Sequence, residues 1–199
     1  MDGTAWAASA MIAARTRLEI ATQNLANVST DGYRRVAARG FMTALGAAVA
    51  REPSRQRGAL RQTGRDLDLA IAGDGAFRVR DASGRVGMTR AGAFVRERDG
   101  TLRDAAGRIL LGLHGPFRLP AEARLDGDGR VLLAGRPIDA LSLPAGARVV
   151  RGFLETAGVD AIAEMVDVLA AERSFESAEK AVAAIDASRR KAAEAARIT

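Results

Sequence analysis

Apolar side chains near the start of the chain recur with alternating steps of four and three residues. They are Ala7, Met11, Ala14, Leu18, Ala21 and Leu25. This spacing predicts a helix from Thr4 with a narrow heptad seam, the pattern of a helix that pairs with another helix. The alanine-rich seam buries little apolar area, and short isolated helices are marginal in water. We therefore expect this helix to need a helical partner.

The exit from the first helix carries its own signals. Asn24 and Asn27 stand three residues apart, which places both on one face of the helix. Asp31 favours a turn, and Gly32 can adopt the positive φ that a chain reversal needs. Residues 1–35 are therefore predicted to form a helix and its exit turn.

A second heptad pattern begins after Gly158, the last glycine of the chain. One stripe consists of Ile162, Val166 and Leu169, and a stripe of shifted phase consists of Ala171, Phe175, Ala178, Val182 and Ile185. The shift predicts a stutter within one long helix in residues 155–199. The two terminal helices are predicted to pair as an antiparallel coiled-coil stalk.

The region between the helices contains all five prolines and most of the glycines. Its first part, residues 36–66, has no regular apolar period. We predict an extended connector there, with a loose helical turn over residues 41–45.

From Leu67 the apolar period changes to two, which is the period of a β-strand. Residues 67–71 and 77–79 lie on either side of a glycine-rich turn and predict a β-hairpin. Short strand-like runs separated by Gly and Asp turns then continue to residue 154. Residues 67–154 are therefore predicted to form a small antiparallel all-β domain, a sandwich or distorted barrel, and the fold class is α+β.

The charge is unevenly placed along the chain. Residues 31–154 hold 13 acidic and 22 basic side chains, whereas residues 155–199 hold nine acidic and six basic ones. A basic middle suggests nucleic-acid binding. However, 28 of the 30 cations are arginine, they are spread evenly, and no aromatic side chains are interleaved for base stacking. A solvated arginine-rich surface is the preferred interpretation.

The chain contains no cysteine, which excludes disulfide and zinc–thiolate chemistry and suits passage through an oxidising space. Residues 5–14 look like the apolar part of a signal peptide. However, Asp2 replaces the usual cationic start and the heptad pattern runs on through Arg15. No stretch reaches the length of a membrane span. We expect no cleaved signal peptide and no direct membrane insertion.

Candidate chemistry in the sequence is sparse. His114 is the single histidine, so it has no partner for a metal site, and a loop histidine without a catalytic role is favoured. The run from Asp126 to Gly129 lacks the remaining ligands of a calcium loop and favours a tight turn. Asp66 and Asp68 alternate with leucines, so we expect them on the solvent face of a strand. We predict no catalytic residues, no metal site and no cofactor.

Four motifs in order resemble bacterial flagellar rod and hook proteins. Residues 24–35, which run from Asn24 through Gly32 and Tyr33 to Arg35, resemble the signature N-L-A-N-V-N-T-x-G-F/Y-K/R-R. Residues 67–77 resemble L-D-x-A-I-x-G-x-G-F-F, and residues 89–94 resemble T-R-x-G-x-F. Residues 152–176 resemble G-x-L-E, E-M-V and Q-R-x-Y/F-E in turn. Residues 115–120 look most like those of proximal rod members.

The resemblance implies a structural subunit of the axial rod in the flagellar basal body. Such subunits are exported unfolded through the flagellar type III apparatus and stack helically with other rod and hook subunits, their terminal helices inside the tube. We therefore expect a cofactor-free protein that binds neither nucleic acid nor membrane. The predicted subunit-packing residues are Met11, Leu18, Asn24, Leu25, Asn27, Gly32, Tyr33, Val166, Leu169, Phe175, Val182 and Ile185.

Three alternatives stay open on the sequence alone. A hook or hook-associated protein would share both terminal helices but would carry a larger middle domain. An arginine-rich nucleic-acid-binding module would show strongly salt-dependent binding to DNA. A carbohydrate-acting enzyme on a β-scaffold would need a pair of carboxylates in a pocket.

Overall fold

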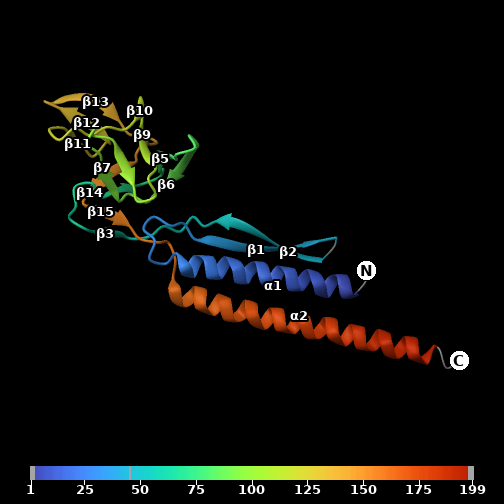
Figure 1. Ribbon diagram of the computed structural model, residues 1–199. Coiled ribbons are helices and arrows are strands. Elements are labelled where there is room, and N and C mark those ends of the chain that lie inside the picture. Colours follow the sequence, from blue (N-terminus) through green and yellow to red (C-terminus); the bar gives the residue numbers. More distant parts are fainter. Residues whose placement is uncertain (1–2, 45, 197–199) are drawn as a thin grey trace. The chain divides into compact units, whose positions relative to one another are not determined.

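The structure is a computed structural model that describes residues 3–44 and 46–196 (Figure 1). The chain divides into two compact units. The helical unit consists of Met1–Val28, Arg35–Arg55 and Val159–Thr199, and the β unit consists of Ser29–Arg34 and Gln56–Gly158. Two terminal helices and a central antiparallel β region confirm the α+β class.

The helical unit contains two antiparallel helices and a β-hairpin (Figure 1). Helix α1 spans Gly3–Ala26 and α2 spans Ala161–Ala195. Asp160 caps α2, since its carboxylate accepts hydrogen bonds from the backbone N–H groups of residues 162 and 163. Strands β1 (Val36–Thr43) and β2 (Gly46–Pro53) pair antiparallel, and the hairpin packs along α1.

Helix α1 is covered on two sides. Ala7, Ala14 and Ala21 of the predicted seam are buried, while its larger members Met11, Leu18 and Leu25 are half-buried. The residues Ala13, Ile20 and Asn24 are also buried although they lie off the seam. The second covered side arises because the hairpin packs on α1 as well as α2.

Helix α2 faces α1 along one uninterrupted heptad line. Its covered positions are Ala161, Glu164, Val168, Ala171, Phe175, Ala178, Val182 and Ile185. The predicted stutter is therefore wrong. Val166 and Leu169 belong to the outer face of α2, because the inner position in that turn is occupied by the charged Glu164.

Residues 36–53 form the β1–β2 hairpin and not the predicted extended connector. The helical turn expected over residues 41–45 is also wrong, since Val36–Thr43 is a strand; Leu45 itself lies outside the described residues. The hairpin has no apolar alternation of its own to reveal it, because its β1 half is mostly exposed. The hairpin packs on α1, and a contact with another segment is not visible in the local pattern.

The β unit is built from short antiparallel strands. They are β3 (Leu60–Gln62), β4 (Leu69–Ala72), β5 (Phe77–Arg80), β6 (Val86–Thr89), β7 (Phe94–Arg96), β8 (Leu102–Asp104), β9 (Ile109–Gly112), β10 (Gly115–Pro116), β11 (Arg124–Leu125), β12 (Arg130–Leu133), β13 (Arg136–Ala140), β14 (Arg148–Arg151) and β15 (Phe153–Glu155). The main sheet has the order β6-β5-β9-β8-β7, with β10 paired to β9. A second sheet has the order β11-β12-β13, and two further pairs are β14-β4 and β15-β3.

These strands enclose one apolar core. Its members are Leu69, Ile71, Phe77, Val79, Phe94, Leu102, Leu110, Phe117, Leu119, Leu125, Val131, Leu141 and Val149. Phe77 and Phe94 meet edge to face at a centroid distance of 5.4 Å, a favourable geometry for two aromatic rings.

Two predictions for the β unit are wrong. Strands β4 and β5 do not form a hairpin, since β4 pairs with β14 and β5 pairs with β6 and β9. Apolar alternation identifies a strand but not its partner, and β4 is buried along most of its length between distant segments. Asp68 is not on a solvent face: its residue is 2% exposed, and its carboxylate accepts hydrogen bonds from Arg65.

Candidate assembly site of the helical unit

A buried asparagine fixes the point where the hairpin leaves α1. Asn24 is fully buried, and its Nδ2 donates to the carbonyl oxygen of Val36 at 2.8 Å. The N–H of Val36 in turn donates to Asn24 Oδ1 at 2.9 Å. The side-chain amide therefore satisfies both backbone groups of the first residue of β1, as a neighbouring strand would.

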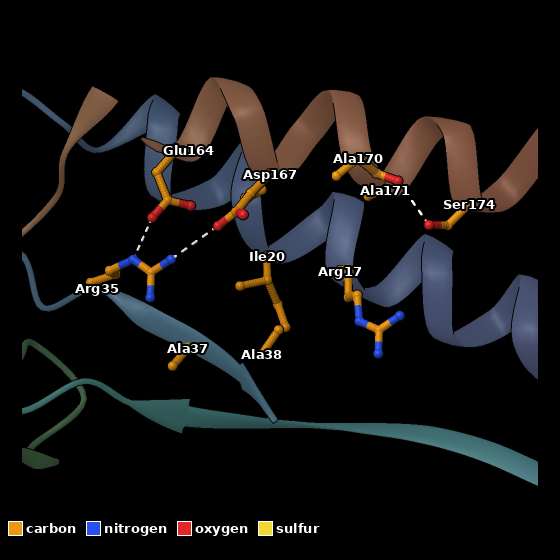
Figure 2. A pocket seen from close by; sticks show the side chains of 11 residues that line it. Arg17, Ile20, Arg35, Ala37, Ala38, Glu164, Asp167, Ala170, Ala171 and Ser174 are labelled. Atoms are coloured by element: carbon orange, nitrogen blue, oxygen red, sulfur yellow. Dashed lines mark hydrogen bonds and ion pairs between the residues drawn. The ribbon is translucent and has the colours of Figure 1, made fainter. Parts of the chain in front are cut away.

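The same asparagine reaches a buried carboxylate on α2. Asn24 Nδ2 lies 3.1 Å from Glu164 Oε2, and the side chain of Glu164 is 1% exposed. Arg35 Nε donates to the other oxygen, Glu164 Oε1, while Arg35 Nη2 donates to Asp167 Oδ2 at 3.2 Å (Figure 2). A buried charge is tolerated only when it is paired and hydrogen-bonded, and both carboxylate oxygens of Glu164 meet this condition.

These contacts close one end of a groove of about 360 Å³ between α1, α2 and β1 (Figure 2). Apart from the charged group, its lining is formed mainly by small side chains. They include Ala21, Ala37, Ala38, Ala170, Ala171 and Ser174. Arg17 and Ile20 of α1 also line this groove. The helical unit thus has an open, mostly small-residue surface beside its buried polar cluster.

The outer face of α2 is apolar at its N-terminal end. Ile162 is 75% exposed, and Met165, Val166 and Leu169 are each more than half exposed. Leu169 lies two residues before the buried Ala171, which places it about 200° around the helix. This cluster of four, which we call the outer patch of α2, therefore points away from α1.

The structure divides the predicted packing residues into groups. Asn24 is buried, and Met11, Leu18, Leu25, Phe175, Val182 and Ile185 are half-buried within the helical unit. Val166 and Leu169 are exposed on the outer patch. Asn27 is half-buried just beyond the end of α1, where its Nδ2 donates to the carbonyl of Gln23 at 2.9 Å. Gly32 and Tyr33 belong to the β unit.

Gly32 has φ +70°, which confirms the predicted positive φ. A Cβ atom at this position would lie 2.2 Å from the backbone nitrogen of Ala91, so no other residue fits. The N–H of Gly32 donates to the carbonyl oxygen of Glu155 at 2.6 Å. The exit turn is therefore held inside the β unit by backbone contacts.

Family comparisons cover most of the chain in three consecutive segments. Residues 6–34 match the family described as flagella basal body rod protein. Residues 70–148 match the flagellar hook protein FlgE/F/G D1 domain, and residues 150–195 match the flagellar basal body rod FlgEFG protein C-terminal family. The chain belongs to the flagellar basal-body rod and hook protein family.

The rod proteins among the relatives are similar to this chain over most of their length, whereas a hook protein is similar over only part of its length. The flagellar basal-body rod protein FlgG of Agrobacterium fabrum is 26% identical, over 94% of this chain and 96% of the relative. The rod protein FlgF of Escherichia coli is 27% identical, over 84% of this chain and 87% of the relative. The hook protein FlgE of Brucella abortus is 35% identical, but over only 52% of this chain and 29% of the hook protein.

The rod and hook family motifs meet at two ion pairs with a buried glutamate, which the sequence did not reveal. One is the Arg35–Glu164 pair of the helical unit. The other lies in the β unit, where Arg90 Nε donates to Glu155 Oε2 at 2.6 Å, and both side chains are less than 10% exposed. The other nitrogens of Arg90 donate to backbone carbonyls of residues 71, 73 and 75.

A signal for these residues was present in the sequence. Each of Arg90, Glu155 and Glu164 is a charged position inside a recognised rod and hook motif: T-R-x-G, G-x-L-E or E-M-V. A charged residue at a fixed place among apolar neighbours indicates a buried partner of opposite charge. The sequence does not say which arginine pairs with which glutamate.

The remaining candidate residues take part in local structure. His114 is exposed, with Nδ1 3.1 Å from Asp139 Oδ1. Asp126 Oδ1 accepts hydrogen bonds from the N–H groups of Asp128 and Arg130, which makes a tight turn. Within the described ranges, no group of three or more His, Asp or Glu side chains has a metal-binding arrangement. In residues 3–44 and 46–196, no helix is both long and apolar enough to cross a membrane.

Proposed function

We propose that this chain is a structural subunit of the flagellar rod that polymerises through α1 and α2 into the axial drive shaft. The observation that carries the proposal is the incomplete burial of the helical unit. Its fully buried apolar residues are mostly alanines, while the large apolar residues Met165, Val166 and Leu169 face outward. Exposed apolar patches of this kind mark sites of protein association.

The terminal helices are proposed to act as a coiled coil in the assembled rod. The covered positions of α2 follow steps of three and four residues from Ala161 to Ile185, which is the heptad spacing. The similarity to rod proteins FlgG and FlgF over most of their length supports the rod in preference to the hook. The hook protein match covers only 29% of its relative.

We further propose export through the flagellar type III apparatus and a position in the periplasm-spanning rod. The absence of cysteine from the chain supports this route, because a cysteine-free chain cannot mispair during passage through an oxidising space. The proposal includes no cofactor, no catalysis and no binding to nucleic acid.

Purified basal bodies provide the test. The wild-type chain is expected to co-purify with basal bodies from detergent-solubilised cell envelopes, and its absence from them would refute the rod role. Leu169→Asp is expected to abolish incorporation, because a charge in an interface that repeats at every subunit is strongly unfavourable. Leu113→Asp changes an equally exposed leucine of the β unit and serves as the matched control. Equal incorporation of both variants would contradict assembly through the helices.

A further inference from the structure

One five-residue turn occurs three times in the β unit. Its sequence is Asp-x-x-Gly-Arg, and the copies begin at Asp81, Asp104 and Asp126, which are 23 and 22 residues apart. Each copy joins two consecutive antiparallel strands, and these pairs are β5–β6, β8–β9 and β11–β12. A sequence pattern that recurs at a nearly constant spacing with the same structure indicates an internal repeat.

The backbone of the three turns is the same. In each copy the N–H of the glycine donates to the carbonyl oxygen of the aspartate, and the N–H of the aspartate donates to the carbonyl oxygen of the arginine, at 2.9–3.1 Å. The glycines are Gly84, Gly107 and Gly129, and their φ angles are +86°, +76° and +78°. This is the geometry of a three-residue hairpin loop that ends in a glycine bulge, and glycine adopts the positive φ without strain.

The aspartate side chain closes each turn in the same way. Its Oδ1 accepts hydrogen bonds from the N–H groups two and four residues later, at 2.8–3.0 Å in all three copies. In the first two copies the arginine also donates from Nε to Oδ2 of the aspartate, at 3.1 Å from Arg85 and 2.6 Å from Arg108. All these contacts lie within five residues of sequence, so the turn needs no other segment of the chain.

The similarity of the first two copies extends beyond the turn. A shift of 23 residues aligns Val79 with Leu102 and Phe94 with Phe117, and all four side chains are buried. In the third copy the residue before the aspartate, Leu125, is also buried. The main sheet consists of β5 to β10, so all its strands come from the stretch that contains the first two copies.

The strands that complete the β unit come instead from its two ends. β14 pairs with β4, β15 pairs with β3, and the N–H of Gly152 donates to the carbonyl oxygen of Asp68 at 2.8 Å. Arg90 and Glu155, which form the buried ion pair, are 65 residues apart. The entropic cost of bringing two segments together grows with the length of chain between them. These closing contacts are therefore the most costly to form from an unfolded chain.

We propose that the β unit contains three copies of one hairpin module and folds in two stages. The modules form first, with the first two assembling the main sheet, and β14 and β15 then close the unit. Three or more strands with an apolar face are stable where a single hairpin is marginal, and chains rich in local contacts fold faster than those with distant ones. In a chain that emerges from its N-terminus, the main sheet then forms before residues 148–155 are available. The proposal goes beyond the rod role and does not depend on it.

Refolding of the purified full-length chain tests the order of the two stages. Pulsed hydrogen exchange, read by NMR at set times after dilution from denaturant, should show protection of the N–H groups of Gly107 and Phe117 before those of Gly152 and Thr156. The first two donate within the second turn and the main sheet, and the last two donate in the closing contacts. Protection of both sets at one rate, or of the closing set first, would overturn the two-stage order.

Folding rates of variants give a second readout. Asp104→Ala removes the acceptor of two N–H groups of its turn, and it should slow refolding about fivefold with little change in the unfolding rate. Glu97→Ala is the matched control. Glu97 begins a turn with the same backbone hydrogen bonds and a glycine at φ +83°, but its carboxylate pairs with Arg103 at 3.5 Å. Refolding of the control should be close to that of the wild type, and equal slowing of both variants would overturn the role of the aspartate.

A closing contact should show the opposite kinetics. Glu155→Gln weakens the ion pair with Arg90, so it should speed unfolding and leave the refolding rate close to that of the wild type. Slower refolding of this variant, with unfolding unchanged, would place the closing contacts in the first stage and overturn the proposal.

Exchange of turn sequences tests whether the modules are equivalent. The double variant Ala105→Gly with Ala106→Asp gives the second turn the sequence of the third, and both replaced side chains are exposed. Its melting temperature and refolding rate should stay close to those of the wild type. Gly107→Ala should lower the melting temperature and slow refolding through backbone strain, because φ is +76° and a Cβ there would have open space around it within the described residues. An unfolded double variant, or an unchanged Gly107→Ala variant, would overturn the equivalence of the modules.

Discussion

The two units of this chain differ in what fills their interiors. The β unit buries large side chains completely, among them Phe77, Phe94 and Phe117. In the helical unit the largest fully buried side chains are those of Glu164 and Asn24, and the remaining buried positions are mainly alanines. Complete burial of a Leu or Phe contributes about 1.5–3 kcal/mol, and an alanine methyl contributes much less.

The difference separates two roles within one fold. The β unit is stabilised by its own core and is expected to fold as an isolated subunit. The helical unit has a buried polar cluster at one end, and several of its large apolar residues, such as Met165, Val166 and Leu169, are exposed. The following experiments compare the stability of the two units and can contradict this difference.

The largest effect is expected for the aromatic pair of the β unit. Phe77→Ala removes a fully buried ring that packs on Phe94, and it should lower the free energy of unfolding of this unit by about 3–5 kcal/mol. Denaturant unfolding followed by near-ultraviolet circular dichroism measures the change. Phe41→Ala, which removes a half-exposed ring from the helical unit, should cost far less. Equal losses would contradict the contrast between the units.

A smaller effect is expected for the polar cluster. Asn24→Ala leaves both backbone groups of Val36 without their partner and removes a hydrogen bond to Glu164, which should cost about 1–3 kcal/mol in the helical unit. Far-ultraviolet circular dichroism during thermal unfolding reports the loss of helix. Asn27→Ala is the matched control, since that residue is only half-buried. A larger loss of stability from Asn27→Ala than from Asn24→Ala would show that the buried amide of Asn24 does not stabilise the helical unit.

Hydrogen exchange of the isolated subunit should rank the elements by their burial. We expect the strongest protection in β4, weaker protection in α1 and the least in the final ten residues of α2, which extend past Gly3. Within α1, residues near Asn24 should exchange more slowly than those near Thr4, because the buried hydrogen bonds of the Asn24 side chain hold the C-terminal end of the helix. Protection in residues 18–25 as strong as that in β4, at low protein concentration, would refute an incomplete helical unit.

The smallest effect is expected for the pH dependence of the β unit. Burial raises the pKa of Asp68, but hydrogen bonds from Arg65 and Thr63 and the charge of Arg65 outweigh it and hold the pKa below its usual value. A carboxyl group with a lowered folded-state pKa stabilises the protein above its unfolded pKa of about 3.9. This stabilisation is lost as the pH falls through the folded-state pKa.

The variant Asp68→Asn should therefore flatten the fall in melting temperature of the β unit on acidification from about pH 5 to pH 2. Asp66→Asn changes the neighbouring acidic residue, which is exposed, and should leave the profile close to that of the wild type. If the melting temperature of Asp68→Asn fell with acidification as much as that of the wild type, the Asp68 carboxylate would not be responsible for the loss of stability at low pH.

The sequence predicted those features that depend on local pattern. The heptad steps of residues 7–25 indicated a pairing helix, and Gly32 indicated the turn with positive φ; both agree with the structure. Alternation of apolar residues also located most strands of the β unit. Local pattern is sufficient in these cases because the period of a helix or strand is visible within one segment.

Features that depend on distant partners were not predictable. β4 pairs with β14, almost 80 residues away, and no local property of β4 specifies that choice. The predicted stripe from Ala171 to Ile185 is the inner line of α2, but the first turns of the helix were assigned to the wrong phase because Glu164 occupies a buried position that apolar patterns leave out. The groups that bury this glutamate, Asn24 and Arg35, lie at the other end of the chain.

The pairing of β3 with β15 has a consequence for how such chains can diversify. The segment that enters the main part of the β unit and the segment that leaves it run side by side, and the N–H of Thr156 donates to the carbonyl of Ala59. A piece of chain whose two ends are neighbours can be enlarged, trimmed or exchanged without altering the distance that the flanking residues must span.

The alignment with FlgG of Agrobacterium fabrum extends over 251 positions although this chain has 199 residues, so the relative contains segments that this chain lacks. Inserts of this kind would allow subunits with the same pair of terminal helices to carry β units of different size.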